Sequence, residues 1–277
     1  MRPSRIAPVA SLWMILILGL IIVGPLLEPR SLYGQSAKAS GKTLLIAAAS
    51  NLRFAMNEIV DEFGKAFQAE VKVAYGSSGS FTAQLMAGAP FDLFFSADEA
   101  LPQKLISKGL ALEDTLYRYG TGQIVLWVAN RSPIRLEKDG MKALLHPSVH
   151  KIAIANPRHA PYGAAAVAAL QNAGLYEGLR SRLVFGENIS EAAHFVRAGS
   201  AEIGILSYAH AIGSPLKESG RFWPIPTSSY PPLNQATIIL GQSRNVPLSK
   251  SFVTFMIEGL GREIMERNGY QTQGHSG

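Results

Sequence analysis

The 277-residue sequence contains no cysteine. This absence excludes disulfide bonds, thiolate metal sites and lipid attachment at a cysteine. A metal site built on histidine is also disfavoured, because the pair at helical spacing, His146 and His150, has the helix-breaking Pro147 between its members. The fold and any ligand site must therefore depend on packing and hydrogen bonding.

The sequence also lacks a run of basic residues, a fixed-period repeat and any low-complexity tract. Its net charge is +6, from 26 Lys and Arg against 20 Asp and Glu, and these residues are scattered along the chain. Nucleic-acid-binding proteins concentrate positive charge in patches. The composition therefore predicts no nucleic-acid partner, and the length suits one large or two modest α/β domains.

Residues 1–39 have the pattern of an export signal. Arg2 and Arg5 give a positive start, residues 12–27 are strongly apolar, and Ala-Lys-Ala at 37–39 fits a cleavage site between small residues. We therefore predict a signal peptide over residues 1–39 and a periplasmic or equivalent extracytoplasmic location.

Two alternatives to that cleavage site stay open. A cut after Gly34 fits nearly as well. The apolar run is also long for a signal peptide, and Glu28 and Arg30 follow it, so an uncleaved membrane-anchored form is the second alternative.

The stretch 44–67 predicts a strand followed directly by a helix. Residues 44–49 form a short apolar run typical of a buried strand. The apolar residues after it have the spacing of an amphipathic helix: Met56, Ile59, Val60, Phe63 and Phe67. Between the two lie Ser50 and Asn51, at a helix start where backbone N–H donors and the positive end of the macrodipole favour an anion.

The remainder of the chain alternates in the same way. Further strands are predicted at 71–75, 91–96, 123–129, 151–155, 183–185, 203–207 and 236–240. A short helix is predicted to follow residues 76–80 and to run through residue 85. Further helices are predicted at 100–108, 164–172, 190–198 and 249–267, with a proline-rich connector at 224–234. Such alternation predicts mostly parallel sheets with helices on both faces, and ligands bind these sheets at the carboxyl ends of the strands.

Four junctions between a predicted strand and a helix carry polar or small residues. They are Ser50-Asn51, Ser77-Ser78, Pro161-Tyr162 and Asn188-Ile189. Each alone is an ordinary helix start, since Ser, Asn and Pro are common there. The segment 76–80, Gly-Ser-Ser-Gly-Ser, is richer in small donors than a cap requires, and its glycines allow a backbone to approach a ligand closely. No Lys or Arg lies at the first two junctions, so neutral N–H and O–H dipoles would have to hold a buried anion.

Four segments together resemble the periplasmic molybdate-binding proteins of ABC transporters. They are LLIAAASNLRFAM, VAYGSSGSFTAQLMAGAPFDLFFSAD, IAIANPRHAPYGAAAVAAL and AEIGILSY. The similarity runs from about residue 44 to residue 270. It implies an α/β fold of the type II periplasmic binding proteins, in which two lobes joined by two crossing strands close over a tetrahedral oxyanion. We place lobe I at residues 40–122 plus 234–277 and lobe II at 123–233.

The resemblance also implies a set of ligand-binding residues. Ser50 and Ser78 would each give a hydroxyl and a backbone N–H to the oxyanion, and Asn51 lies at the next backbone donor. Tyr162 and Ile189 would supply backbone N–H groups from the second lobe. The ligand is molybdate or tungstate, no cofactor is expected, the partner is a membrane permease, and the protein is expected to be a monomer and not an enzyme.

One position departs from the family pattern. Some members have a ligand-contacting tyrosine directly after the strand Gly-Ile-Leu, where this chain has Ser207, with Tyr208 one residue later. Tyr208 could reach the ligand after a local shift, Tyr162 could take over the hydroxyl role, or the contact could be absent. We favour Tyr162, because its turn already faces the ligand in this interpretation.

Two other functions are kept as alternatives. A site of donors alone would reject hydrogen phosphate, whose proton needs an acceptor, but only cavity size would reject sulfate, so a protein for sulfate or another oxyanion is the first alternative. The second is a periplasmic hydrolase with Ser50 or Ser78 as nucleophile, although no G-x-S-x-G motif is present and only His159 lies near a site loop. Asp92 and Asp98 could suggest a catalytic pair, but a strand-end residue and a helix cap explain them as well.

Overall fold

The computed structural model describes residues 43–272. These described residues belong to one compact unit by their contacts. The predicted signal peptide lies outside the described residues. Within the described part of the chain, no helix is long and apolar enough to cross a membrane.

The first sheet has five strands in the order β2-β1-β3-β10-β4. Their bounds are β1 Thr43–Ala49, β2 Glu70–Gly76, β3 Leu93–Ser96, β4 Tyr117–Gly122 and β10 Leu233–Ile239. β1 pairs in parallel with β2 and β3, whereas β10 is antiparallel to both β3 and β4. Four strands therefore run in one direction and β10 runs against them.

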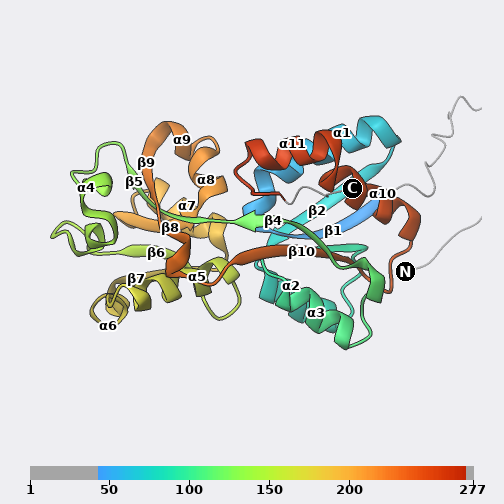
Figure 1. Ribbon diagram of the computed structural model, residues 1–277, viewed down its shortest axis with the longest axis horizontal. Helices are drawn as coiled ribbons and strands as arrows, with labels where there is room; N and C mark the ends of the chain where they lie inside the picture. The colour runs from blue at the N-terminus through green and yellow to red at the C-terminus, as the bar shows by residue number, and fades with distance from the viewer. Residues whose placement is uncertain (1–42, 273–277) are drawn as a thin grey trace, which may run out of the picture. The chain divides into compact units, whose positions relative to one another are not determined.

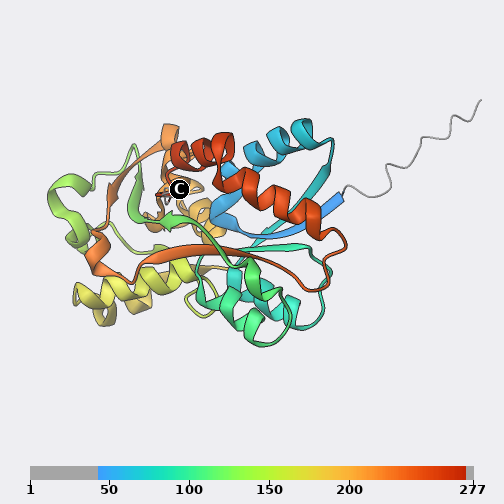
Figure 2. The ribbon, with the colours of Figure 1, turned by 45° about the vertical axis from the view of Figure 1, so that its right-hand side comes forward.

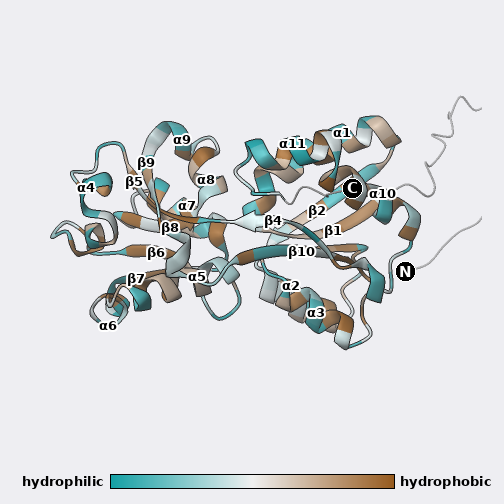
Figure 3. Cartoon of the chain, in the orientation of Figure 1, coloured by the Kyte–Doolittle hydropathy of each residue, from teal (hydrophilic) through white to brown (hydrophobic). Residues whose placement is uncertain are grey.

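Helices cover both faces of this sheet. One face packs against α1 Arg53–Phe67, α10 Val246–Ile257 and α11 Gly259–Arg267, and the other against α2 Ser78–Met86 and α3 Ala100–Ser107. Each face has its own apolar core. Helices such as α3 mix hydrophilic and hydrophobic residues, as expected for elements with one buried side (Figure 3).

The second sheet repeats this plan in the order β7-β6-β8-β5-β9. Its strands are β5 Ile124–Ala129, β6 Ile152–Ala155, β7 Leu183–Gly186, β8 Ile203–Ser207 and β9 Gly220–Pro224. β6 is parallel to β7 and β8, and β5 is the one reversed strand. The helices around it are α4 Leu136–Asp139, α5 Pro161–Asn172, α6 Tyr176–Leu179, α7 Ile189–Arg197, α8 Tyr208–Ile212 and α9 Leu216–Ser219.

We call each sheet with its helices a lobe. The chain passes from the first lobe to the second between β4 and β5, and returns between β9 and β10 (Figures 1 and 2). The two passages are hydrogen-bonded to each other at both ends, because β4 pairs with β10 and β5 pairs with β9. Five short 3-10 turns complete the elements: Ser50–Leu52, Glu113–Thr115, Gly140–Leu145, Arg180–Arg182 and Thr227–Ser229. The α/β fold class predicted from the sequence is confirmed, while the predicted residue limits of the lobes stay a prediction.

The predicted helix over 249–267 is wrong in one respect, since two helices occupy this region. The break lies at Glu258, whose φ of −125° and ψ of 162° are extended, and Gly259 follows with a φ of 46°. The apolar spacing continues across the break, so the periodicity does not reveal it. Gly261 lies against the backbone of Phe255, where a Cβ would overlap the carbonyl oxygen. The close approach of the two helices therefore depends on that glycine.

Two strands, β4 and β9, have no counterpart among the predicted elements. Both lie at the edge of their sheets, and their sequences, YRYGTG and GRFWP, contain glycine, arginine or proline instead of an apolar run. Edge strands need to bury only part of their surface. Hydrophobic pattern alone therefore does not detect them.

Asp92 connects three segments of the first lobe. One carboxylate oxygen accepts the backbone N–H of Leu45 at 2.8 Å. The other accepts the backbone N–H of Arg244 at 2.9 Å and the hydroxyl of Ser243 at 2.8 Å. Asp98 instead accepts the N–H of Leu101 at 3.0 Å, beside the start of α3. These contacts account for both carboxylates without a catalytic pair.

We expect Asp92→Ala to lower the free energy of unfolding by about 2 kcal/mol, because two partly buried N–H groups and the Ser243 hydroxyl lose their acceptor. The measurement is urea unfolding followed by circular dichroism, with Asp61→Ala on the exposed side of α1 as the control. A loss as small as that of the control would show that the Asp92 contacts do not stabilise the fold.

Candidate functional site

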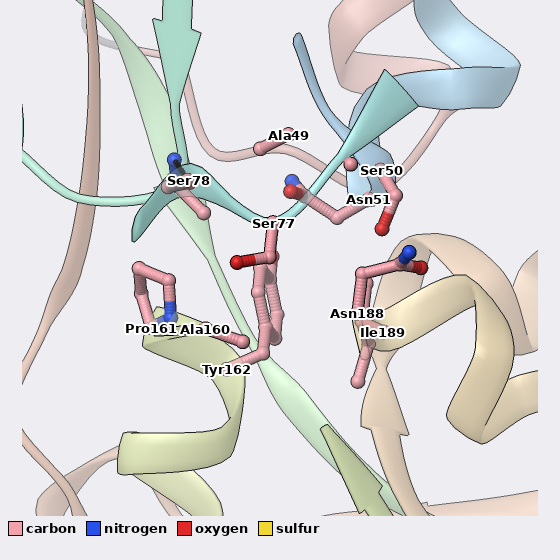
Figure 4. A pocket seen from close by; sticks show the side chains of 12 residues that line it. Ala49, Ser50, Asn51, Ser77, Ser78, Ala160, Pro161, Tyr162, Asn188 and Ile189 are labelled. Atoms are coloured by element: carbon pink, nitrogen blue, oxygen red, sulfur yellow. Dashed lines mark hydrogen bonds between the residues drawn. The ribbon is translucent and has the colours of Figure 1, made fainter. Parts of the chain in front are cut away.

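A small cavity lies between the lobes, at the carboxyl ends of strands from both sheets. Figure 4 shows the side chains around it. Its lining residues are Ala49, Ser50, Asn51, Gly76, Ser77, Ser78, Ala97, Ala160, Pro161, Tyr162, Asn188 and Ile189. All four junctions singled out in the sequence therefore meet at one place. The volume open to the centre of a water-sized sphere is about 10 Å³, which suits a compact ligand and not a sugar or a peptide.

Two buried serines face this cavity with their hydroxyl oxygens already hydrogen-bonded. The Ser78 Oγ accepts the backbone N–H of Ala97 at 3.0 Å, and the Ser50 Oγ accepts that of Ser190 at 3.4 Å. Ser50 and Ser78 are 2 % and 1 % exposed. Because each oxygen already accepts an N–H, its own proton can be donated to a ligand.

Three helices begin at the cavity and add backbone donors. Ser78 is the first residue of α2, Ile189 is the first residue of α7, and Tyr162 is the second residue of α5, after Pro161. The first N–H groups of a helix have no acceptor within the helix, and they carry its positive end. Together with the two hydroxyls, these groups make a site for an anion.

The lining residues, all within the described part of the chain, include no Lys, Arg, His, Asp or Glu. Within residues 43–272 no group of three His, Asp or Glu side chains could hold a metal ion. The site therefore offers neutral dipoles. A negatively charged ligand would lose its water there and gain hydrogen bonds from N–H and O–H groups.

A network of uncharged side chains lies behind the cavity. The Asn51 Nδ2 donates to the Gln235 Oε1 at 2.8 Å and to the Tyr270 Oη at 2.9 Å. The Tyr119 hydroxyl donates to the same Gln235 oxygen at 3.0 Å, and the Gln235 Nε2 donates to the Tyr162 Oη at 3.0 Å. Burial raises the pKa of Tyr119, Tyr162 and Tyr270 above the usual value, so these phenols stay neutral. The network fixes Asn51 without placing a charge near the ligand.

Tyr162 and Tyr208 are the two tyrosines considered above for a hydroxyl contact with the ligand. The Tyr162 hydroxyl lies against Gln235 and Gly122, where a Cβ would overlap it, while its backbone lines the cavity. Tyr208 is not among the lining residues, and its ring packs edge-on against Phe222 at 5.5 Å. Which of the three alternatives for a tyrosine hydroxyl applies therefore stays a prediction.

A buried histidine supports the site from the second lobe. The His210 Nε2 lies 2.9 Å from the Ser190 Oγ, and its Nδ1 lies 2.7 Å from the Ser207 Oγ. The Ser190 hydroxyl donates to the Ser50 carbonyl oxygen at 3.3 Å. Because the Ser190 hydroxyl has only this one proton, its oxygen must accept from His210, which places the hydrogen of the neutral ring on Nε2. The Nδ1 of His210 then accepts the hydroxyl proton of Ser207. Burial and the charge of Arg53 lower the pKa of His210 to about 4, which keeps the ring neutral.

The sequence did not point to this support. Ser190, His210, Gln235 and Tyr270 are spread over two helices, a strand and the C-terminal segment, and none belongs to a recognisable motif. Their only local sign is a polar residue within an otherwise buried element. Partners that lie between 140 and 219 residues apart cannot be paired from one sequence.

Two α/β lobes with a small polar cavity between them define the class of two-lobed solute-binding proteins. A family model described as bacterial extracellular solute-binding protein matches residues 44–271, and the chain belongs to this family. The family and the fold class predicted from the sequence are thereby confirmed.

Several relatives are named as molybdate-binding proteins. The chain is 35% identical over 240 residues to the molybdate-binding protein ModA of Rhodobacter capsulatus, covering 87% of this chain and 92% of the relative. It is 32% identical over 236 residues to ModA of Azotobacter vinelandii, covering 85% of this chain and 92% of the relative. The solved structure of the Azotobacter vinelandii periplasmic molybdate-binding protein superposes with a TM-score of 0.78 at 30% identity, covering 83% of this chain and 99% of that one. The sulfate-binding protein SubI of Mycobacterium tuberculosis shares the fold, with a TM-score of 0.71 at 14% identity.

Stability should depend on the protonation of His210. The pKa of His210 is about 4 in the folded protein, compared with the ordinary value of 6.5 that applies to the unfolded chain. As the pH falls below 6.5, the unfolded chain therefore binds more protons than the folded protein does. The stabilisation is complete above pH 6.5 and is lost progressively toward pH 4, by up to about 3 kcal/mol. The measurement is urea unfolding at several pH values.

The variant His210→Gln should be less stable than the wild type at pH 7. Because glutamine does not titrate, this variant should lose less stability than the wild type between pH 6.5 and pH 4. His194→Gln, at an exposed position of α7, is the control and should follow the wild type. Parallel pH profiles for all three proteins would contradict the assignment to His210.

Proposed function

We propose that this protein captures molybdate, and also tungstate, outside the cytoplasmic membrane and delivers it to the permease of an ABC transporter. The observation that carries the proposal is the pair of buried serines, Ser50 and Ser78, whose hydroxyl protons are free to point into a cavity without charged side chains. Family membership and the molybdate-binding relatives support the same ligand. The protein acts as a monomer without a cofactor.

Five of the predicted ligand residues have a physical role in this proposal. Ser50 and Ser78 donate hydroxyl and backbone protons, and Asn51 donates its backbone N–H. Tyr162 and Ile189 donate backbone N–H groups from the second lobe at the starts of α5 and α7. Tyr208 has no role, since its ring packs against Phe222.

Selectivity follows from the ratio of donors to acceptors in the lining. Molybdate and tungstate carry no proton near neutral pH, so every oxygen accepts. Hydrogen phosphate carries a proton that needs an acceptor, and an unpaired proton costs about 1–3 kcal/mol. The Asn51 Oδ1 is a buried acceptor without a hydrogen-bond partner in the described residues, so discrimination against hydrogen phosphate requires this oxygen to point away from the ligand. Sulfate has the same charge as molybdate and shorter bonds, so cavity size must exclude it.

A hydrolase is the alternative from another class, and one observation favours it. The Ser77 Oγ lies 2.8 Å from the His159 Nδ1, and the His159 Nε2 lies 3.4 Å from Glu187. The Ser77 hydroxyl, however, also donates to the His159 carbonyl oxygen at 2.8 Å, and its oxygen caps α2. A hydroxyl has a single proton, which this contact uses. The close relatives are binding proteins, and we propose that this protein is one and not an enzyme.

The first test is calorimetric titration of ligand-stripped residues 40–277 with molybdate, tungstate, sulfate and phosphate. We expect one-to-one binding of molybdate and tungstate, with sulfate and phosphate far weaker. Sulfate binding equal to molybdate would change the proposed ligand. No binding of any oxyanion, together with hydrolysis of a generic ester that Ser77→Ala abolishes, would favour the hydrolase.

The second test is Ser78→Ala. Loss of one hydrogen bond to a charged ligand costs about 1.5–3 kcal/mol, so molybdate affinity should fall by roughly ten- to a hundredfold. Ser107→Ala, at an exposed position of α3, is the matched control and should bind like the wild type. Unchanged affinity in Ser78→Ala, with the melting temperature recorded to confirm folding, would place the ligand elsewhere.

A further inference from the structure

At one edge of the cavity the two lobes are hydrogen-bonded directly to each other. The N–H of Gly79 donates to the His159 carbonyl oxygen at 2.8 Å, and the Ser77 hydroxyl donates to the same oxygen at 2.8 Å. The Ser80 hydroxyl donates to the Glu187 Oε1 at 3.1 Å, while the Glu187 Oε2 lies 3.4 Å from the His159 Nε2. We call these five residues the His159 clasp. Three of them belong to the first turn of α2 or its cap, and two to loops of the second lobe.

The clasp leaves no space for a side chain at Gly79. A Cβ at this position would lie 2.6 Å from the His159 carbonyl oxygen and 2.8 Å from its Cα and Cβ. Real Cβ contacts are essentially never this short, and two of the atoms met belong to the backbone, so a rotamer change cannot relieve the overlap. The φ of Gly79 is not among the positive values of the chain, so alanine suits its own backbone conformation. The three nearest atoms that this Cβ would meet all belong to the second lobe.

The clasp also borders two of the proposed donors. Ser78 lies between Ser77 and Gly79 on the first lobe, and Tyr162 follows His159 by three residues on the second. Separation of the clasp would therefore move these two donor groups apart. Because every contact of the clasp joins two groups of the chain, it stabilises the closed arrangement by itself.

We propose that the His159 clasp holds the lobes closed and thereby sets ligand affinity, and that Gly79 is the position that permits closure. This inference rests on the proposed function for the identity of the ligand. A ligand binds the closed arrangement, so its apparent affinity falls in proportion to the fraction of molecules that are closed. His159, Glu187, Ser80 and Gly79 act as positioning residues, because none of them needs to touch the oxyanion.

The first experiment measures closure in the ligand-free protein. The chain has no cysteine, so Lys104→Cys and Gln171→Cys give one spin-label site on each lobe, both at exposed positions. Double electron–electron resonance then reports the distance between the lobes in the full mature chain. Gly79→Ala should shift the distribution to longer distances. Gly178→Ala, where a Cβ meets no atom within 4 Å, is the matched control and should leave it unchanged.

The second experiment measures binding of molybdate to the same variants by stopped-flow and calorimetry. Gly79→Ala should weaken affinity at least tenfold, mainly through faster dissociation, and the melting temperature of the ligand-free state is recorded to confirm that the variant folds. His159→Ala removes the ring but keeps the carbonyl acceptor, so its effect should be smaller, about two- to fivefold.

The outcomes separate the two proposals. A wild type that fails to bind molybdate, with a distance distribution that still lengthens in Gly79→Ala, would refute the proposed ligand and support the clasp. A wild type that binds molybdate, with Gly79→Ala equal to Gly178→Ala in both distance and affinity, would overturn the clasp and leave the proposed function standing.

Discussion

The first backbone N–H groups of a helix have no acceptor inside that helix, and the arrangement of this protein depends on how this constraint is met. Strand β1 leads into a 3-10 turn at Ser50, and α2, α5 and α7 begin at the same cavity. Each start offers donors that water or a ligand must satisfy. Two sheets of the same strand plan, with their carboxyl ends turned to one place, bring the donors of four segments together. The fold supplies the chemistry of the site through its backbone as much as through side chains.

Neutrality is the second constraint. A lysine or arginine in the lining would bind almost any anion, whereas fixed dipoles discriminate through number, direction and spacing. The buried Asn51, Gln235 and Tyr270 hold the donors in place by hydrogen bonds between uncharged groups. His210 serves in its neutral form for the same reason. The lining of the cavity thus carries no charged side chain, while hydrogen bonds fill its surroundings.

Most of the fold and the donor segments could be predicted from sequence, and the supporting contacts could not. Ser50, Ser78, Tyr162 and Ile189 lie at strand-to-helix junctions, which hydrophobic period and capping residues reveal locally. Edge strand β4 and the break at Glu258 lack such a local signal, because the first buries little apolar surface and the second interrupts no apolar spacing. The hydrogen bond between Asn51 and Tyr270 joins residues at opposite ends of the described chain. Only the folded arrangement shows that pair.

The place of β10 in the first sheet has a consequence for the order in which the protein can be completed. β10 lies between β3 and β4 although more than a hundred residues separate it from either in the chain. The strands of the second sheet, in contrast, all lie between Ile124 and Pro224. A ribosome makes the N-terminal end first. The first lobe therefore lacks an inner strand of its sheet until Leu233–Ile239 has been synthesised. The lobe that is synthesised first is thus completed last, and the hydrogen bond from Asn51 behind the cavity forms later still, only after Tyr270 has been made.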